Sequence, residues 1–116
     1  MATSSIIGVE LPNGTVKAVY CHWDGYPKGV GASLLSKRFS TTEQVEEFIN
    51  EGARSTVKLS YAAMRGEDTP PDTYSSVDEY FASDLEEWGY LFTRDGEWIV
   101  KDMYANSNPQ PVATLI

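Results

Sequence analysis

The chain contains only one cysteine and one histidine, and its nine basic residues are few for 116 positions. The single cysteine, Cys21, excludes an internal disulfide and a zinc site built from cysteines. With one histidine, His22, and scattered carboxylates, no clustered set of metal ligands occurs, so no metal or other cofactor is expected. The first residues do not show the pattern of a secretory signal, and no run of about 18 apolar residues occurs. We therefore expect a cytoplasmic protein that does not span a membrane.

Acidic residues outnumber basic ones by 17 to 9, which gives a formal net charge of -8. This charge repels phosphate backbones and anionic lipids, so direct binding of nucleic acid or of a membrane surface is not expected. It attracts a basic partner, and an acidic domain of this size can act as a DNA mimic in a basic cleft. The acids are scattered along the chain, which is also typical of a solvated surface that serves solubility alone.

Length and composition predict a single α+β domain over residues 1–104, followed by an extended tail over 105–116. Two β-hairpins are expected to build a mostly antiparallel twisted sheet, because Asn13-Gly14 and Asp95-Gly96 each separate two apolar runs. Two-residue turns would place Glu10 opposite Lys17 as an ion pair. The apolar end of the tail is suited to docking on a sheet edge or on a neighbour, so self-association is a further expectation.

About three helices are expected to pack on this sheet. The apolar spacing over 30–39 predicts the first helix. Overlapping capping boxes at 40–44 and a closing glycine, Gly52, predict the second. A third capping box, Ser76 with Glu79, predicts a helix that runs to about residue 85. A short strand is expected over 55–61 and a long loop over 62–74.

Catalysis is not supported by the residue types. Cys21 and His22 are neighbours in a predicted strand, so their side chains point to opposite faces and do not form a nucleophile and base pair. His22 is more simply explained as a core or interface histidine. The acids of the second helix are most simply a solvated face, and no enzyme activity is expected.

The segment 20–31 is the most informative stretch, because it combines aromatic, ionisable and glycine residues within twelve positions. It predicts a strand that runs into a tight turn and then a helix start. Such a start, with Lys28 beside exposed amides at Gly29 and Gly31, is a natural anion site, whereas the alternative is that the glycines only permit a turn. The segment is therefore either a binding lip or a structural corner. The candidate ligand-binding residues are Trp23, Asp24, Tyr26, Lys28, Gly29 and Gly31, with Arg65 as a phosphate clamp, Tyr90 as a stacking ring, and Arg94.

Several segments resemble a widespread family of small proteins found in phage and prophage genomes, most of which have no assigned function. The resemblance runs from Ile6 to about Met103 and is carried by CHWDGYP at 21–27, the glycines and leucines of 29–35, the loop at 65–67 and the hairpin at 90–98. The loop keeps a single arginine, Arg65, where the family carries a longer element with two. The resemblance implies a phage-type accessory protein that acts in the host cytoplasm by binding.

These observations predict a non-enzymatic anti-defence or host-modulating protein that sequesters a small phosphorylated signal, such as a cyclic nucleotide. The alternative is an acidic inhibitor that binds a host protein through its charged surface and apolar tail. The first hypothesis needs an accessible hollow beside the 24–31 segment. The second predicts salt-sensitive capture of a specific host protein, which is lost when the acids of the second helix are neutralised.

Overall fold

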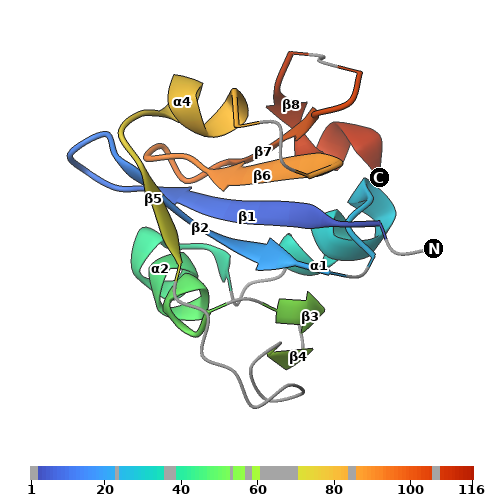
Figure 1. Ribbon diagram of the computed structural model, residues 1–116, viewed down its shortest axis with the longest axis horizontal. Helices are drawn as coiled ribbons and strands as arrows, with labels where there is room; N and C mark the ends of the chain where they lie inside the picture. Colours follow the sequence, from blue (N-terminus) through green and yellow to red (C-terminus); the bar gives the residue numbers. More distant parts are fainter. Residues whose placement is uncertain are drawn as a thin grey trace.

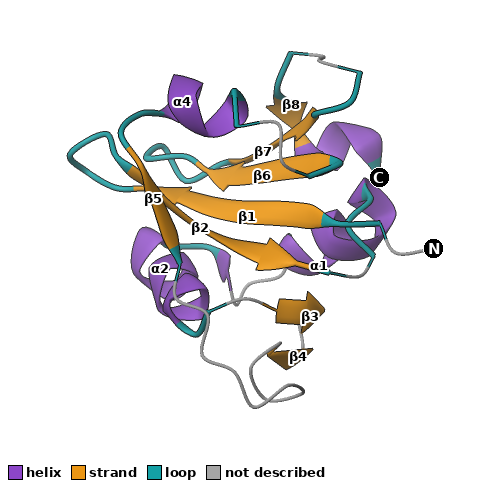
Figure 2. Cartoon of the chain, in the orientation of Figure 1, coloured by secondary structure: helices purple, strands orange, loops and turns teal. Residues whose placement is uncertain are grey.

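A single mixed β-sheet with helices on both faces forms the protein in a computed structural model, which describes residues 3–22, 24–35, 39–52, 54–56, 59–60, 71–83, 86–105 and 108–116 (Figures 1 and 2). The α+β class predicted from the sequence is confirmed. Trp23, Arg65 and most of the predicted 62–74 loop lie outside the described residues. Within the described ranges, every helix is too short or too polar to cross a lipid bilayer.

The sheet has the strand order β4-β3-β2-β1-β6-β7-β8, and β5 also pairs with β2. The β1–β6 and β2–β3 pairs are parallel, and the other described pairs are antiparallel. The parallel β1–β6 pair joins the two predicted hairpins into one sheet (Figure 1). The strands are β1 (Ser5–Glu10), β2 (Val16–Cys21), β3 (Arg54–Thr56), β4 (Leu59–Ser60), β5 (Asp72–Tyr74), β6 (Trp88–Phe92), β7 (Trp98–Asp102) and β8 (Gln110–Pro111).

Both predicted hairpins form, but the register of each is shifted by one residue from the two-residue turn that we expected. In the first hairpin Glu10 pairs with Val16, and the Gly14 amide donates to the Leu11 carbonyl at 2.9 Å. Gly14 has φ +88° and is the residue of this turn that lies in the left-handed region. The loop is therefore a type I turn followed by a left-handed glycine. Pro12 explains this choice, because a two-residue turn would need an N–H that proline does not have.

The second hairpin repeats this loop. The Gly96 amide donates to the Thr93 carbonyl at 2.9 Å, Gly96 has φ +82°, and Phe92 pairs with Trp98. Arg94 consequently lies inside the loop and not opposite a residue of β7. In both hairpins the glycine is the last residue of the turn. The observed register therefore differs from the predicted register by one residue, in the same direction, in each hairpin.

The register shift also changes the ion pairs. The predicted Glu10–Lys17 pair is wrong: the Lys17 ammonium lies 3.5 Å from Glu46 and donates to the Asn50 amide oxygen at 2.6 Å. The Glu10 carboxylate instead lies 3.1 Å from the Arg94 guanidinium. This second pair ties together the two hairpin turns at one end of the sheet.

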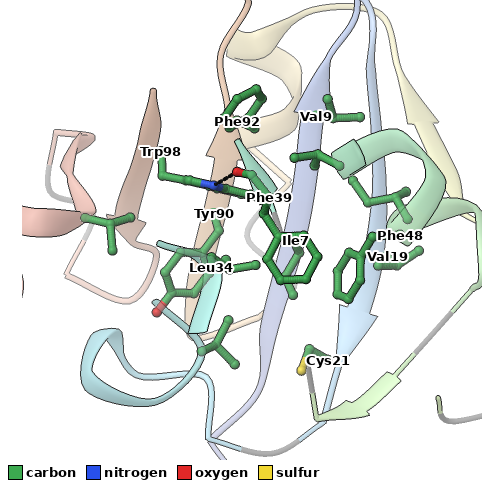
Figure 3. Close-up of a cluster of buried hydrophobic side chains, with 14 of the residues drawn as sticks. Ile7, Val9, Val19, Cys21, Leu34, Phe39, Phe48, Tyr90, Phe92 and Trp98 are labelled. Atoms are coloured by element: carbon green, nitrogen blue, oxygen red, sulfur yellow. Dashed lines mark hydrogen bonds between the residues drawn. The ribbon is translucent and has the colours of Figure 1, made fainter. Parts of the chain in front are cut away.

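Each face of the sheet packs against its own helices. On one face the strands pack against α2 (Thr42–Asn50) and the helical turns near residues 30 and 112. Figure 3 shows this core, with Trp98 and Tyr90 on the same side of the sheet as Ile7. On the other face Leu91 and Met103 pack against α4 through Tyr80. A two-residue turn in the second hairpin would have placed Trp98 and Leu91 on one face, whereas the observed register places them on opposite faces. Face one holds Ile7, Val9, Val19, Cys21, Tyr90, Phe92, Trp98 and Val100; face two holds Ile6, Val16, Ala18, Leu91 and Met103.

The helices are η1 (Pro27–Gly31), α1 (Ala32–Leu34), α2 (Thr42–Asn50), α4 (Val77–Phe81) and η3 (Val112–Leu115). The helix predicted over 30–39 begins earlier than expected, as the wide turn η1, and α1 ends at Leu34; residues 36–38 lie outside the described residues. The predicted capping box of α2 is confirmed, with Thr41 as the N-cap and Gln44 as its partner. The Ser76 cap of α4 is confirmed as well, but the helix ends at Phe81 and not near residue 85 as predicted. At the C-terminus β8 pairs with the edge of β7, and Val112 is buried.

The Thr41→Ala variant is expected to lower the free energy of unfolding by about 0.5–2 kcal/mol. The backbone N–H of Gln44 would lose the Thr41 hydroxyl that accepts its hydrogen bond at 3.2 Å. Urea denaturation followed by circular dichroism measures the change. Thr42→Ala is the matched control, since Thr42 is the first residue inside the helix and has no capping role. Equal stability of the two variants would contradict this role for the capping box.

Candidate ligand site at the corner after strand β2

The chain turns sharply after β2, and the turn is held by backbone contacts. Asp24 has φ +59° and is the non-glycine residue in the left-handed region among those described. Its carbonyl accepts a hydrogen bond from the Val30 amide at 2.7 Å. Gly29 lies directly against this carbonyl, and a Cβ at position 29 would be 2.4 Å from the Asp24 oxygen. Glycine is therefore required at position 29 by the close approach of two backbone segments.

Two further contacts fasten the corner to the sheet. The Gly25 amide donates to the Thr3 carbonyl at 2.8 Å, and the Tyr90 hydroxyl donates to the Gly25 carbonyl at 2.6 Å. Gly31 lies against Tyr90 and Val112, so η1 is packed between β6 and η3. The glycines at 25, 29 and 31 thus serve the packing of the corner, which is the alternative that the sequence left open.

The predicted anion site at the backbone amides does not form as expected. Pro27 has no amide hydrogen, the Gly29 amide donates to the Tyr26 carbonyl at 2.9 Å, and the Val30 amide is used by Asp24. The amides of Gly29 and Val30 are therefore not available to an anion.

A hollow of about 350 Å³ lies next to the corner. Its wall is mainly apolar and comes from three separate parts of the chain: η1, the start of β6 and η3. Tyr26 is 43% exposed, and Lys28 is exposed beside it. The lining residues are Tyr26, Pro27, Lys28, Trp88 and Leu115. The site therefore offers two aromatic rings, one leucine and one ammonium group.

Asp24 shapes the polar side of this hollow. The Tyr26 hydroxyl donates to the Asp24 carboxylate at 3.2 Å. The negative charge of Asp24 raises the pKa of the Tyr26 phenol above its ordinary value of 10.0, so Tyr26 stays neutral at physiological pH. The carboxylate also holds the ring at the edge of the hollow. A ligand at this site would meet one cation, Lys28, and one nearby anion.

Of the nine predicted site residues, the structure brings Tyr26 and Lys28 together at the hollow, with Asp24 hydrogen-bonded to Tyr26. Tyr90 is fully buried, and burial raises the pKa of its phenol, so its ring offers no face for stacking. Arg94 pairs with Glu10 at the far end of β6, about one strand length or 15–20 Å away. Gly29 and Gly31 lie behind the site as packing residues, and Trp23 and Arg65 lie outside the described residues.

Sequence reasoning missed Pro27, Trp88 and Leu115 as lining residues. Trp88 belongs to the predicted second hairpin and Leu115 to the predicted tail, and both predictions follow local patterns. The apolar character of the last residues was the available signal, because it indicated that this segment docks on something.

Cys21 and His22 both lie in structural contacts in the part of the chain that the structure describes. Cys21 is fully buried in the core, and His22 is hydrogen-bonded to the Tyr20 hydroxyl at 2.5 Å through Nδ1. Histidine, cysteine and carboxylate side chains in this part of the chain do not gather in a group of three that would hold a metal ion.

No protein-family model, curated protein or solved structure matches this chain. The resemblance to phage proteins therefore stays a prediction, and the functional argument depends on the geometry above.

Proposed function

We propose that the protein is a non-enzymatic binding protein that sequesters a small phosphorylated ligand of the cyclic-nucleotide class in the hollow beside η1. In the setting that the phage resemblance implies, it would act in the host cytoplasm as an anti-defence or host-modulating protein. The observation that carries the proposal is the hollow itself, in which Lys28 stands at the edge of a wall that contains Tyr26 and Trp88.

The lining matches the two halves of such a ligand. A base is planar and apolar on its faces, and stacking on an aromatic side chain contributes about 1–3 kcal/mol per base. The Lys28 ammonium would pair with the phosphate, while Asp24 disfavours additional negative charge close to Tyr26. The site therefore favours a ligand with a single negative charge. The volume of about 350 Å³ lies at the low end of the range of about 300–1,000 Å³ for small-molecule sites, which favours a mononucleotide.

Isothermal calorimetry with cyclic AMP, cyclic GMP and cyclic UMP tests the proposal. We expect saturable binding of at least one nucleotide, and a loss of about tenfold in affinity for Lys28→Ala and for Tyr26→Ala, which corresponds to about 1.4 kcal/mol. Both side chains are exposed, so the variants are expected to fold.

Arg94→Ala is the matched control, because it removes a cation at the far end of β6. Its affinity should equal that of the unchanged protein. Absence of heat with all three nucleotides at about 50 μM protein would remove the proposal, and so would an equal loss of affinity in Arg94→Ala and Lys28→Ala.

A further inference from the structure

A second hollow of about 490 Å³ lies between α1, the turn that joins β6 to β7, and the C-terminal segment. It shares no lining residue with the hollow beside η1. The two sites can therefore be altered independently. Its walls include Leu34, Leu35, Phe92, Trp98, Pro111 and Ala113.

The floor of this second hollow is apolar and firmly packed. Trp98 is 6% exposed, and its indole N–H donates to the Phe39 carbonyl at 3.0 Å, as Figure 3 shows. The indole therefore has no remaining donor and presents carbon atoms to the hollow. Leu35 is 44% exposed at the wall of the hollow. A side chain that covers Leu35 would remove apolar area from water.

The rim of the same hollow is acidic. Asp95 and Glu97 line it from the β6–β7 turn, and both residues are exposed. Neither carboxylate makes a salt bridge with another residue in the described ranges, whose ion pairs are Lys17–Glu46 and Arg94–Glu10. The rim thus offers negative charge directly beside exposed apolar surface.

We propose that this second hollow binds a basic segment of another protein in which a leucine or aromatic side chain stands next to lysine or arginine. The apolar side chain would cover Leu35, and the basic side chains would pair with Asp95 and Glu97. The net charge of -8 would draw such a segment toward the protein and would raise its association rate. The second hollow and the hollow beside η1 have no lining residue in common, so each proposal can be tested without altering the other site.

Fluorescence anisotropy with a labelled synthetic peptide of alternating leucine and lysine tests this surface. We expect saturable binding that weakens by about three- to tenfold in the double variant Asp95→Asn/Glu97→Gln and by a similar factor in Leu35→Ala. A peptide of alternating serine and lysine should bind less tightly to the unchanged protein, because it lacks the apolar anchor.

The charge-matched control is Asp72→Asn/Asp78→Asn, which removes two exposed carboxylates on β5 and α4, away from this hollow. It should retain the affinity of the unchanged protein. An equal loss in this control would show attraction by net charge alone and would overturn the proposal. Equal binding of the serine peptide, or no saturable binding of the leucine peptide, would overturn it as well. Circular dichroism establishes that each variant is folded.

Discussion

Replacement of Tyr80 by alanine is expected to lower the free energy of unfolding by about 3–5 kcal/mol, the range for loss of a large buried aromatic side chain. Tyr80 is fully buried on the second face of the sheet, where its ring lies at 5.3 Å from the Tyr74 ring and 5.1 Å from the Phe81 ring. Gly8 on β1 makes room for it, because a Cβ at position 8 would lie 2.9 Å from the Tyr80 ring. The ring is therefore a fully buried contact between α4 and the sheet.

The hydroxyl of the same residue makes a separate contribution. It donates to the Tyr90 carbonyl at 2.5 Å and lies 3.2 Å from the Ile6 carbonyl, so it is bonded at the junction of β1 and β6. Burial raises the pKa of Tyr80 well above its ordinary value, which keeps the group neutral and able to donate. Tyr80→Phe is expected to lower the free energy of unfolding by about 1–2 kcal/mol.

Urea denaturation of Tyr80→Ala and Tyr80→Phe measures both contributions. Tyr104→Ala is the matched control, because Tyr104 is 72% exposed and its loss should change stability by about 0.5 kcal/mol or less. If Tyr80→Ala unfolds at the same urea concentration as Tyr104→Ala, the inference that the Tyr80 ring stabilises the packing of α4 on the sheet is contradicted.

The elements that could be predicted from the sequence are those whose signals are local. The capping residues Thr41 and Ser76 mark the starts of α2 and α4, and the glycine-containing turns mark both hairpins. The predicted register of both hairpins was wrong, because the turn type depends on which residue takes positive φ. In both hairpins that residue is the glycine at the fourth position of the turn, Gly14 or Gly96. A shift of one residue in the pairing moves the side chains of one strand to the opposite face of the sheet relative to its partner strand.

The lining of the candidate site beside η1 could be predicted only where its residues are close together in the sequence. Tyr26 and Lys28 lie two positions apart, so a local motif contains both. Trp88 reaches the same hollow because β6 pairs in parallel with β1, and Leu115 reaches it because η3 follows β8 at the sheet edge. These pairings join segments that are far apart in the chain, and no local periodicity specifies them. Tyr90 is buried for the same reason, since Gly31 and Val112 close over it.

The Gly29→Ala variant is expected to lose about 1–3 kcal/mol of stability and to lose nucleotide affinity together with it. The added methyl group would lie 2.4 Å from the Asp24 carbonyl, which cannot move away without giving up its hydrogen bond from Val30. The segment around Tyr26 and Lys28 would have to shift, and the hollow would change shape. Thermal unfolding and calorimetry with the cyclic nucleotides measure the two effects.

Lys28→Ala separates packing from binding at this corner, because Lys28 is exposed and adjacent to Gly29. It should leave stability within about 0.5 kcal/mol of the unchanged protein while it weakens nucleotide binding. Gly29→Ala should reduce both. If Gly29→Ala is as stable as the unchanged protein, the close approach of Gly29 to Asp24 does not hold the corner. If instead it loses stability as expected but no nucleotide binds to the unchanged protein, the corner is a structural element and the sequestration proposal is wrong.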